Sequence, residues 1–333
     1  MDDVLNLLAG HYEMKGKEER KVKKLLVCFL IIVSSLSFMG CNKEKAAPAP
    51  QKTITIGVMP DVESIPFIIA EKNGYFTKEG VQVKIVPFKS AKDRDSALQS
   101  GQLDGMISDI IAVVFANEGG INLKIIAKTE GNLAFMAGKN SGIKSLADLK
   151  GKNVGLSTNT IMEYTTDRIL ETAQLKPDDI KKIAIPQIPT RLEMLQGGKV
   201  DAAIMPEPQS TLAIKNGATV LSSTDQLKNK AGAITFTAKS LQESPAEIKA
   251  VFKAYNDAVA YLNKEPVANY VDFIIQSQGF PAEVKDILKL PQYSNAEPPS
   301  EKIFNDVVQW MKAKNLIKGN YEYKALIDDK VLR

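Results

Sequence analysis

Two stretches of the chain align without a gap at an offset of 97 residues: Arg94-Asp-Ser-Ala-Leu-Gln-Ser-Gly-Gln-Leu-Asp-Gly-Met-Ile107 and Arg191-Leu-Glu-Met-Leu-Gln-Gly-Gly-Lys-Val-Asp-Ala-Ala-Ile204. They share Arg, Leu, Gln, Gly, Asp and Ile at equivalent positions. Each has the pattern of a helix that stops at a glycine and leads into a strand. Chance agreement between two common helix–strand units is the alternative. We interpret the match as one α/β plan used twice.

The segments around the first copy extend this plan. Residues 53–58, 81–86 and 103–108 have the pattern of short strands, and they alternate with helical patterns at 64–74 and 91–100. Strands that alternate with helices indicate a mostly parallel sheet covered by helices, so the fold class is α/β.

The second copy is predicted to be inserted into the first. Two apolar, strand-like runs at 133–137 and 233–238 bracket it, as expected of two crossover segments. This organisation predicts two α/β lobes joined by two crossover hinges. The domain boundaries that follow are 53–130 for the first part of lobe 1, 131–236 for lobe 2, and 237–333 for the return to lobe 1 and the C-terminal helices.

The composition excludes several function classes. The chain has 333 residues, 44% of them hydrophobic and 25% charged, and its net charge of +4 is too dilute to predict nucleic-acid binding. Its one histidine and two cysteines, His11, Cys28 and Cys41, all lie at the N-terminus. The remaining chain therefore has no residues for histidine-based catalysis, Cys/His zinc sites or internal disulfides. We expect no metal and no cofactor.

The N-terminus has the pattern of a targeting segment. Lys21, Lys23 and Lys24 precede an apolar run at 25–33, which is short for a membrane span of about 20 apolar residues but fits a secretory signal. An uncleaved signal anchor is the alternative. Residues 1–13 fit neither interpretation, and Met14 is a more natural start. We predict a signal peptide at 1–40.

The end of that run resembles the lipobox of bacterial lipoproteins. The sequence Ser37-Phe-Met-Gly-Cys41 places a small residue directly before the cysteine, although Phe38 is unusual where Leu is expected. The resemblance implies that Cys41 is diacylated and becomes the first mature residue, since two acyl chains suffice for stable membrane anchoring. Residues 41–52 are polar and rich in Pro and Ala, which is typical of a flexible tether.

No strong catalytic motif occurs in the mature region. A carboxylate pair acting as acid and base stays possible in principle, but Asp and Glu are common surface residues. Polar groups instead follow the predicted strands, where free backbone amides form sites for anions and polar ligands. Plain helix capping is the alternative for each residue. Those expected to bind ligand are Asp61, Glu63, Ser64, Ser108, Asp109, Thr158, Asn159, Thr160 and Arg191, the last within a predicted capping box at 190–193.

Several motifs together resemble the nitrate/sulfonate/taurine-type solute-binding proteins, a family that also includes thiamine-pyrimidine-binding members. They are the lipobox, the tether, Asn73-Gly-Tyr-Phe-x-x-Glu-Gly-Val81, Gln99-Ser-Gly-Gln-Leu-Asp-Gly105 and Asp148-Leu-Lys-Gly-Lys-Asn-Val-Gly155. The likeness covers residues 53–320. It implies a type II periplasmic-binding-protein fold and a cleft between the lobes, whose loops include Met59 and Glu207. It also implies an exported, lipid-anchored monomer that delivers a small polar or anionic ligand to an ABC permease and its ATPase.

The first loop departs from what a simple anion would need. Asp61 and Glu63 bring two carboxylates to it, and burying them against a sulfonate or nitrate is costly unless Arg191 or Lys89 neutralises them. A ligand with an amine, amidine or aminopyrimidine suits these carboxylates better. A ligand-sensing accessory of a membrane receptor is the second hypothesis. A pyrimidine-synthesising enzyme on the same fold is less favoured, since such relatives use His and Cys chemistry that the mature chain lacks.

Overall fold

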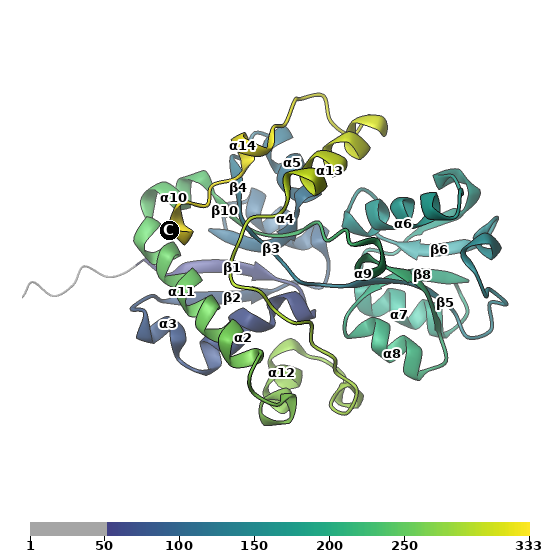
Figure 1. Cartoon of the computed structure of the whole chain (residues 1–333), viewed down its shortest axis with the longest axis horizontal. Helices are drawn as coiled ribbons and strands as arrows, with labels where there is room; N and C mark the ends of the chain where they lie inside the picture. Colours follow the sequence, from purple (N-terminus) through teal and green to yellow (C-terminus); the bar gives the residue numbers. More distant parts are fainter. Residues whose placement is uncertain (1–51) are drawn as a thin grey trace, which may run out of the picture. The chain divides into compact units, whose positions relative to one another are not determined.

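The computed structural model describes residues 52–333 (Figure 1). The predicted signal peptide at 1–40, the predicted lipidation site Cys41 and all but the last residue of the tether lie outside the described residues. Within 52–333, no helix combines the length and the apolar content that a membrane span requires. This part of the chain folds into two lobes, each built on a five-stranded sheet.

The sheet of the first lobe has the strand order β2-β1-β3-β10-β4. Strand β1 (Ile54–Val58) pairs in parallel with β2 (Val83–Pro87) and with β3 (Gly105–Asp109). Strand β10 (Gly232–Thr237) runs antiparallel between β3 and β4 (Leu123–Lys128). Every residue of β3 is buried, as expected for a sheet that helices cover on both faces.

The sheet of the second lobe repeats this order with different strands, β7-β6-β8-β5-β9. Strand β6 (Asn153–Leu156) is parallel to β7 (Lys181–Ala184) and to β8 (Ala202–Pro206). Strand β5 (Leu133–Ala137) is antiparallel to β8 and to β9 (Thr219–Ser223). Each lobe therefore contains one antiparallel strand beside its third parallel strand.

Helices cover the sheets. In the first lobe α2 and α11 pack together on one face, while α5 and α13 pack together on the other. The helices of this lobe are α2 (Ile65–Lys72), α3 (Tyr75–Lys78), α4 (Ala91–Gln99), α5 (Ile110–Glu118), α10 (Ala238–Glu243), α11 (Pro245–Leu262), α12 (Val271–Gln278), α13 (Glu301–Ala313) and α14 (Tyr323–Leu326). Those of the second lobe are α6 (Ile161–Thr172), α7 (Ile188–Gln196), α8 (Gln209–Lys215) and α9 (Thr224–Leu227). Short 3-10 turns occupy Val62–Ser64, Leu146–Leu149, Pro177–Asp179, Val267–Asn269, Ala282–Val284 and Lys330–Leu332.

The predicted internal repeat is confirmed. Helix α4 and strand β3 of the first lobe correspond to α7 and β8 of the second at the 97-residue offset that the sequence shows. Gly101 and Gly198 follow the two helices with φ of 74° and 66°, a left-handed conformation that favours glycine. The same short sequence therefore ends a helix and starts a strand in both lobes.

Two crossovers connect the lobes. Residues 129–132 lead from β4 in the first sheet to β5 in the second, and residues 228–231 lead from α9 back to β10. The apolar runs predicted as crossovers are the strands directly after them, because each run enters the middle of a sheet. The change of lobe expected after residue 236 thus falls before Gly232, since β10 already pairs with β3.

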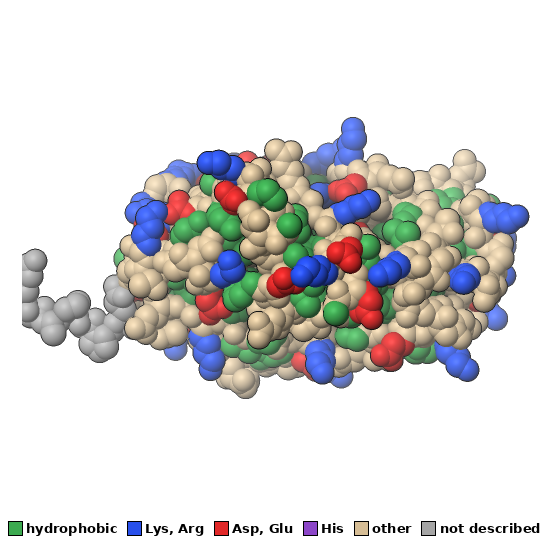
Figure 2. Space-filling view, turned by 90° about the horizontal axis from the view of Figure 1, so that it is seen from below, with side chains coloured by type: hydrophobic (Ala, Val, Ile, Leu, Met, Phe, Trp, Pro, Cys, Tyr) green, Lys and Arg blue, Asp and Glu red, His purple; other side chains and the backbone are tan. Residues whose placement is uncertain are grey.

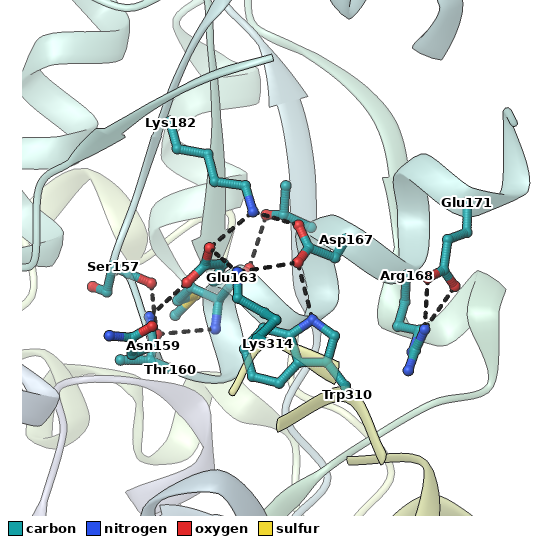
Figure 3. A network of polar contacts seen from close by, with 12 residues as sticks. Ser157, Asn159, Thr160, Glu163, Asp167, Arg168, Glu171, Lys182, Trp310 and Lys314 are labelled. Carbon is teal, nitrogen blue, oxygen red and sulfur yellow. Dashed lines mark hydrogen bonds and ion pairs between the residues drawn. The ribbon is translucent and has the colours of Figure 1, made fainter. Parts of the chain in front are cut away.

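Helix α13 also bridges the lobes. Its predicted apolar stripe is confirmed: Phe304, Val307, Val308 and Met311 are buried and pack with α5, and Ile303 is partly buried at the edge. The opposite side of α13 faces α6 of the second lobe (Figure 3). There the contacts are polar: Lys314 pairs with Glu163 at 2.7 Å.

Candidate functional site

A cavity of about 60 Å³ lies between the two lobes, at the carboxyl ends of their parallel strands. Both lobes and both crossovers contribute to its lining. The polar lining residues are Asp61, Glu63, Arg94, Ser108 and Asp109 from the first lobe, Ser157, Thr160, Arg191 and Thr224 from the second, and Lys230 from a crossover. The location agrees with the rule that ligands of α/β sheets bind beyond the carboxyl ends of strands.

The loop after β1 supplies the first carboxylates. Met59, Asp61 and Glu63, which the sequence assigns to ligand binding, all line the cavity. Oδ1 of Asp61 accepts a hydrogen bond of 3.0 Å from the amide of Glu63 and so caps the turn that follows β1. Ser64 is different: its fully buried hydroxyl has two acceptors within hydrogen-bond distance, the carbonyl of Asp61 at 2.8 Å and Oε1 of Gln278 at 3.2 Å. The prediction that Ser64 faces the ligand is therefore wrong, because these local acceptors turn its hydroxyl into the lobe.

Glu63 lies against the first crossover and against the start of β10, directly after the second crossover. Its carboxylate accepts a hydrogen bond from the hydroxyl of Thr129. Gly131 and Gly232 leave the space that Glu63 fills, since a Cβ atom at either position would clash with the Glu63 side chain. A group bound at Glu63 would thus touch the segments where the chain passes between the lobes.

The end of β3 provides the third carboxylate. Oδ1 of Asp109 accepts a hydrogen bond of 2.9 Å from the amide of Ala112 and caps α5. Ser108, beside it, lines the cavity and is 5% exposed, and its hydroxyl has no hydrogen-bond partner within residues 52–333. Since buried hydroxyl groups are normally hydrogen-bonded, Ser108 offers an unused polar contact to a ligand.

Burial shifts the titration of all three carboxylates. It raises the pKa of Asp61 well above its ordinary range, and the neighbouring Glu63 adds to this shift. It also raises the pKa of Glu63, against the hydrogen bond from Thr129. For Asp109 burial raises the pKa to about 6, although the positive charge of Arg94 opposes it. The site therefore holds carboxylates that are costly to keep ionised.

Two arginines occupy equivalent positions in the repeat. Nη1 of Arg94 donates to the carbonyl of Ile107, and Nη1 of Arg191 donates to the carbonyl of Ile204, both at 2.9 Å. Arg94 was missing from the predicted site although the aligned repeat pairs it with Arg191. That alignment was the signal that could have identified it.

Arg191 mainly holds its own lobe together. It is fully buried, and its guanidinium also donates to the carbonyl of Ile185 at 3.0 Å and to the hydroxyl of Ser157 at 2.7 Å. The predicted capping box at 190–193 is wrong, since α7 begins at Ile188 with Pro189 in its first turn. Neither of the two residues considered as possible neutralising partners of the first-loop carboxylates pairs with them: Arg191 donates to these acceptors, and Lys89 lies exposed outside the cavity.

The loop before α6 contributes one of its three predicted residues. Thr160 lines the cavity and caps α6 by accepting from the amide of Met162 at 3.2 Å. Thr158 and Asn159 are exposed and lie outside the lining. Ser157, which sequence reasoning missed, lines the cavity instead. The Asn159 amide donates to Glu163 at 2.7 Å, which fixes the loop against α6 (Figure 3).

Glu207 caps a helix and does not line the cavity. Its carboxylate accepts from the amide and the hydroxyl of Thr211, at 3.2 and 2.7 Å. The sequence predicts that the Glu207 side chain contacts the ligand. The structure does not place it there, because its carboxylate bonds to the start of α8 and lies outside the lining. Its backbone carbonyl nevertheless accepts from the amide of Val62 at 3.3 Å, so the lobes touch here at the edge of the cavity.

The comparisons with known proteins agree with this architecture. The family model described as "NMT1/THI5 like" matches residues 61–269. The chain belongs to this family. A Bacillus subtilis (strain 168) protein named as an aliphatic sulfonates-binding protein is 26% identical over 298 residues, which are 86% of this chain and 87% of that protein. A Brachyspira hyodysenteriae protein named as an ABC transporter periplasmic binding protein is 23% identical over 74% of this chain and 76% of its own length.

Solved structures of the same fold extend the family comparison. The alkanesulfonate-binding protein SsuA from Xanthomonas axonopodis pv. citri, bound to MOPS, has a TM-score of 0.73 at 18% identity, covering 84% of this chain and 99% of that one. The desulfurization enzyme DSZB has a TM-score of 0.62 at 14% identity, covering 85% of this chain and 98% of its own. These matches confirm the predicted type II periplasmic-binding-protein fold. The curated relatives described above are named as binding proteins and not as enzymes.

Proposed function

We propose that this chain is the solute-binding lipoprotein of an ABC importer. It captures a small polar ligand between its lobes and delivers it to a permease and its ATPase. One observation carries the proposal: corresponding loops of two repeated lobes meet around one cavity lined by carboxylates, hydroxyl groups and arginines. Two short crossovers beside that cavity are the geometry expected of a hinge that closes on a ligand.

The relatives support transport rather than chemistry at this site. A binding protein needs groups that hold a ligand, whereas an enzyme also needs groups that transform it. Residues 52–333 contain neither His nor Cys, and the likeness to a desulfurization enzyme concerns the fold alone. The curated relatives named above supply the transport context, and a permease partner follows from it.

The proposed location is the outer side of the cell membrane. The signal-like segment and the lipobox-like sequence ending at Cys41 support export and lipid anchoring. Mass spectrometry of the protein extracted from membranes tests this point, and we expect a diacylglyceryl group on Cys41. A soluble mature protein that begins at another residue would contradict the anchor.

The charge distribution fits a protein that handles small molecules. On the face of the described residues that Figure 2 shows, basic and acidic side chains are interspersed. A mixture of acidic and basic side chains is common on protein surfaces, whereas nucleic-acid-binding domains gather their basic residues in a patch or stripe.

Ligand-induced closure is the decisive test of the proposed function. Purified protein is screened by thermal shift against sulfonates, nitrate, taurine and aminopyrimidines, and each hit is followed by small-angle X-ray scattering. We expect a ligand to raise the melting temperature by mass action and to reduce the radius of gyration. Consumption of a ligand by the pure protein would instead indicate an enzyme.

A further inference from the structure

The cavity holds three carboxyl groups that no cation of the described residues pairs with. Asp61 and Asp109 are 5% and 4% exposed, and Glu63 is partly buried beside them. Within residues 52–333, no Lys or Arg nitrogen lies within the 4.0 Å of an ion pair from these three carboxylates. Burying carboxylates without a paired cation is unfavourable. A positively charged group on the ligand would supply the missing ion-pair partner.

The two cavity arginines are committed to other partners. Arg94 forms an ion pair with Asp95 at 2.8 Å and donates to the carbonyl of Ile107. Arg191 donates to two carbonyls and to Ser157, as described above. Lys230, at the edge, pairs with Asp225 at 2.9 Å. Arg94 attracts all three carboxylates at longer range and opposes the rise of their pKa, but neither arginine forms an ion pair with them among the described residues.

A second observation points to a ligand at the same place. The Ser108 hydroxyl lines the cavity and is buried without a partner in the described part of the chain. Ser108 and Asp109 both line the cavity, so a ligand that fills it has access to the Asp109 carboxylate and to this hydroxyl. An ammonium or amidinium group has several N–H donors and satisfies both acceptors at once.

A metal ion does not fit this arrangement. No group of three or more His, Cys, Asp or Glu side chains within residues 52–333 is placed to hold a metal. All three carboxylates line the cavity without forming such a group, which leaves an organic cation as the positively charged partner.

We infer that the ligand carries a positively charged nitrogen. The carboxylates of Asp61, Glu63 and Asp109 accept its hydrogen bonds, and the Ser108 hydroxyl is a further acceptor. This inference rests on the proposed solute-binding function and names the chemical class of its ligand. It separates this chain from a receptor for simple anions, since a sulfonate or nitrate alone would place its negative charge beside carboxyl groups that burial already makes costly to ionise.

Matched ligand pairs test the inference directly. Binding to the purified full chain is measured by calorimetry for taurine against ethanesulfonate and for β-alanine against propionate, since the amine of the first member of each pair is cationic at neutral pH. We expect at least one amino member to bind at least about tenfold more tightly than its partner lacking the amine. Equal or tighter binding of the partners overturns the cationic class while keeping the binding function. Binding by none of the compounds counts against both.

Substitution of the carboxylates completes the test. Glu63→Gln removes a charge with little change of shape, and we expect it to weaken binding of the amino member about tenfold while the partner lacking the amine binds no worse. Glu71→Gln, on the exposed side of α2, is the matched control. If Glu63→Gln fails to fold, Asp109→Asn replaces it, because Asn also caps a helix. Unchanged binding of the amino member in these variants overturns the inference.

Discussion

Nε1 of Trp310 donates a hydrogen bond of 2.9 Å to Oδ2 of Asp167, and this contact joins helix α13 to helix α6 of the second lobe (Figure 3). The Asp167 side chain is 1% exposed and also pairs with Lys182 at 2.6 Å. Lys314, one turn after Trp310, supplies a second cation to the neighbouring Glu163. The second lobe therefore relies on the C-terminal helix of the first lobe to complete a buried polar network.

Trp310→Phe should destabilise the protein by about 2–3 kcal/mol. The change removes the hydrogen bond to Asp167 and leaves a small void, although part of the edge-on contact with the Tyr164 ring at 5.6 Å can remain. Urea unfolding followed by far-ultraviolet circular dichroism measures the effect, since Trp310 is the single tryptophan. Gln309→Ala, at an exposed position of the same helix, is the control. Equal stability of the two variants would show that the indole contact is unimportant.

Lys314→Met should destabilise the protein at neutral pH and much less in acid. Burial alone would raise the pKa of Glu163, but the Asn159 amide, Lys182 and Lys314 more than offset it and lower the pKa to about 2. A carboxyl group with a lowered pKa stabilises the fold above its ordinary pKa of 4.5, and this contribution is lost as the pH falls through about 2. Without Lys314 the pKa of Glu163 rises, so the contribution at neutral pH shrinks.

The expected loss for Lys314→Met is about 1–2 kcal/mol at pH 7. It is smaller than for a fully buried pair because the Lys314 side chain is 28% exposed and Lys182 remains. Urea unfolding at pH 7 and at about pH 2, where the folded-state carboxyl of Glu163 becomes protonated, measures it. Lys312→Met, at an exposed position two residues away, is the matched control. An equal loss at both pH values would contradict the role of Glu163.

Arg191→Lys should cost about 2–4 kcal/mol of stability. The guanidinium bonds to Ile185, Ile204 and Ser157 radiate from one planar group, and a lysine ammonium cannot reproduce that geometry. Thermal unfolding of the ligand-free protein measures the loss. The comparison is Lys181→Arg, a change between the same two residue types at an exposed position. Normal stability with impaired ligand binding would show instead that Arg191 serves the ligand.

The sequence predicts the scaffold of the site better than its side chains. The repeat that links Arg94 to Arg191 gives both lobes and both strand ends, because helix periodicity, glycine stops and buried strands are local patterns. Side-chain direction depends on competition between nearby acceptors. Ser64 and Glu207 stand in the predicted loops, yet one bonds to its own turn and the other caps α8. No local pattern distinguishes those outcomes from ligand binding.

The bridging role of α13 was outside the reach of sequence patterns for a related reason. The apolar stripe from Phe304 to Met311 predicts that the helix packs on something, and it does pack on α5. The partners of Trp310 and Lys314 lie more than 140 residues away in α6. Such contacts follow from the tertiary fold alone, so neither composition nor spacing indicates them.

Asp109→Asn should stabilise the ligand-free protein at pH 7.5 and leave it nearly unchanged at pH 4. The raised pKa of Asp109, about 6 against an ordinary 3.8, means that the folded state favours the protonated form. Protonated Asp109 adds to the free energy of unfolding. This contribution is fully present below pH 3.8 and is lost as the pH rises through about 6, and for this pKa shift it is about 3 kcal/mol. Asn lacks the charge and keeps the cap on α5, so the variant avoids that loss.

The gain expected for Asp109→Asn at pH 7.5 is about 1–2 kcal/mol, because relaxation around Asp109 reduces the full difference. Arg94 loses one neighbouring negative charge but keeps its ion pair with Asp95. Thermal unfolding of dialysed protein between pH 4 and 7.5 measures the effect, with Asp178→Asn at an exposed position as the control. If Asp109 instead stabilises the empty protein at neutral pH, the variant melts lower there. A gain for the empty protein combined with weaker binding of amino ligands would show that Asp109 is retained for its ligand, at a cost in stability.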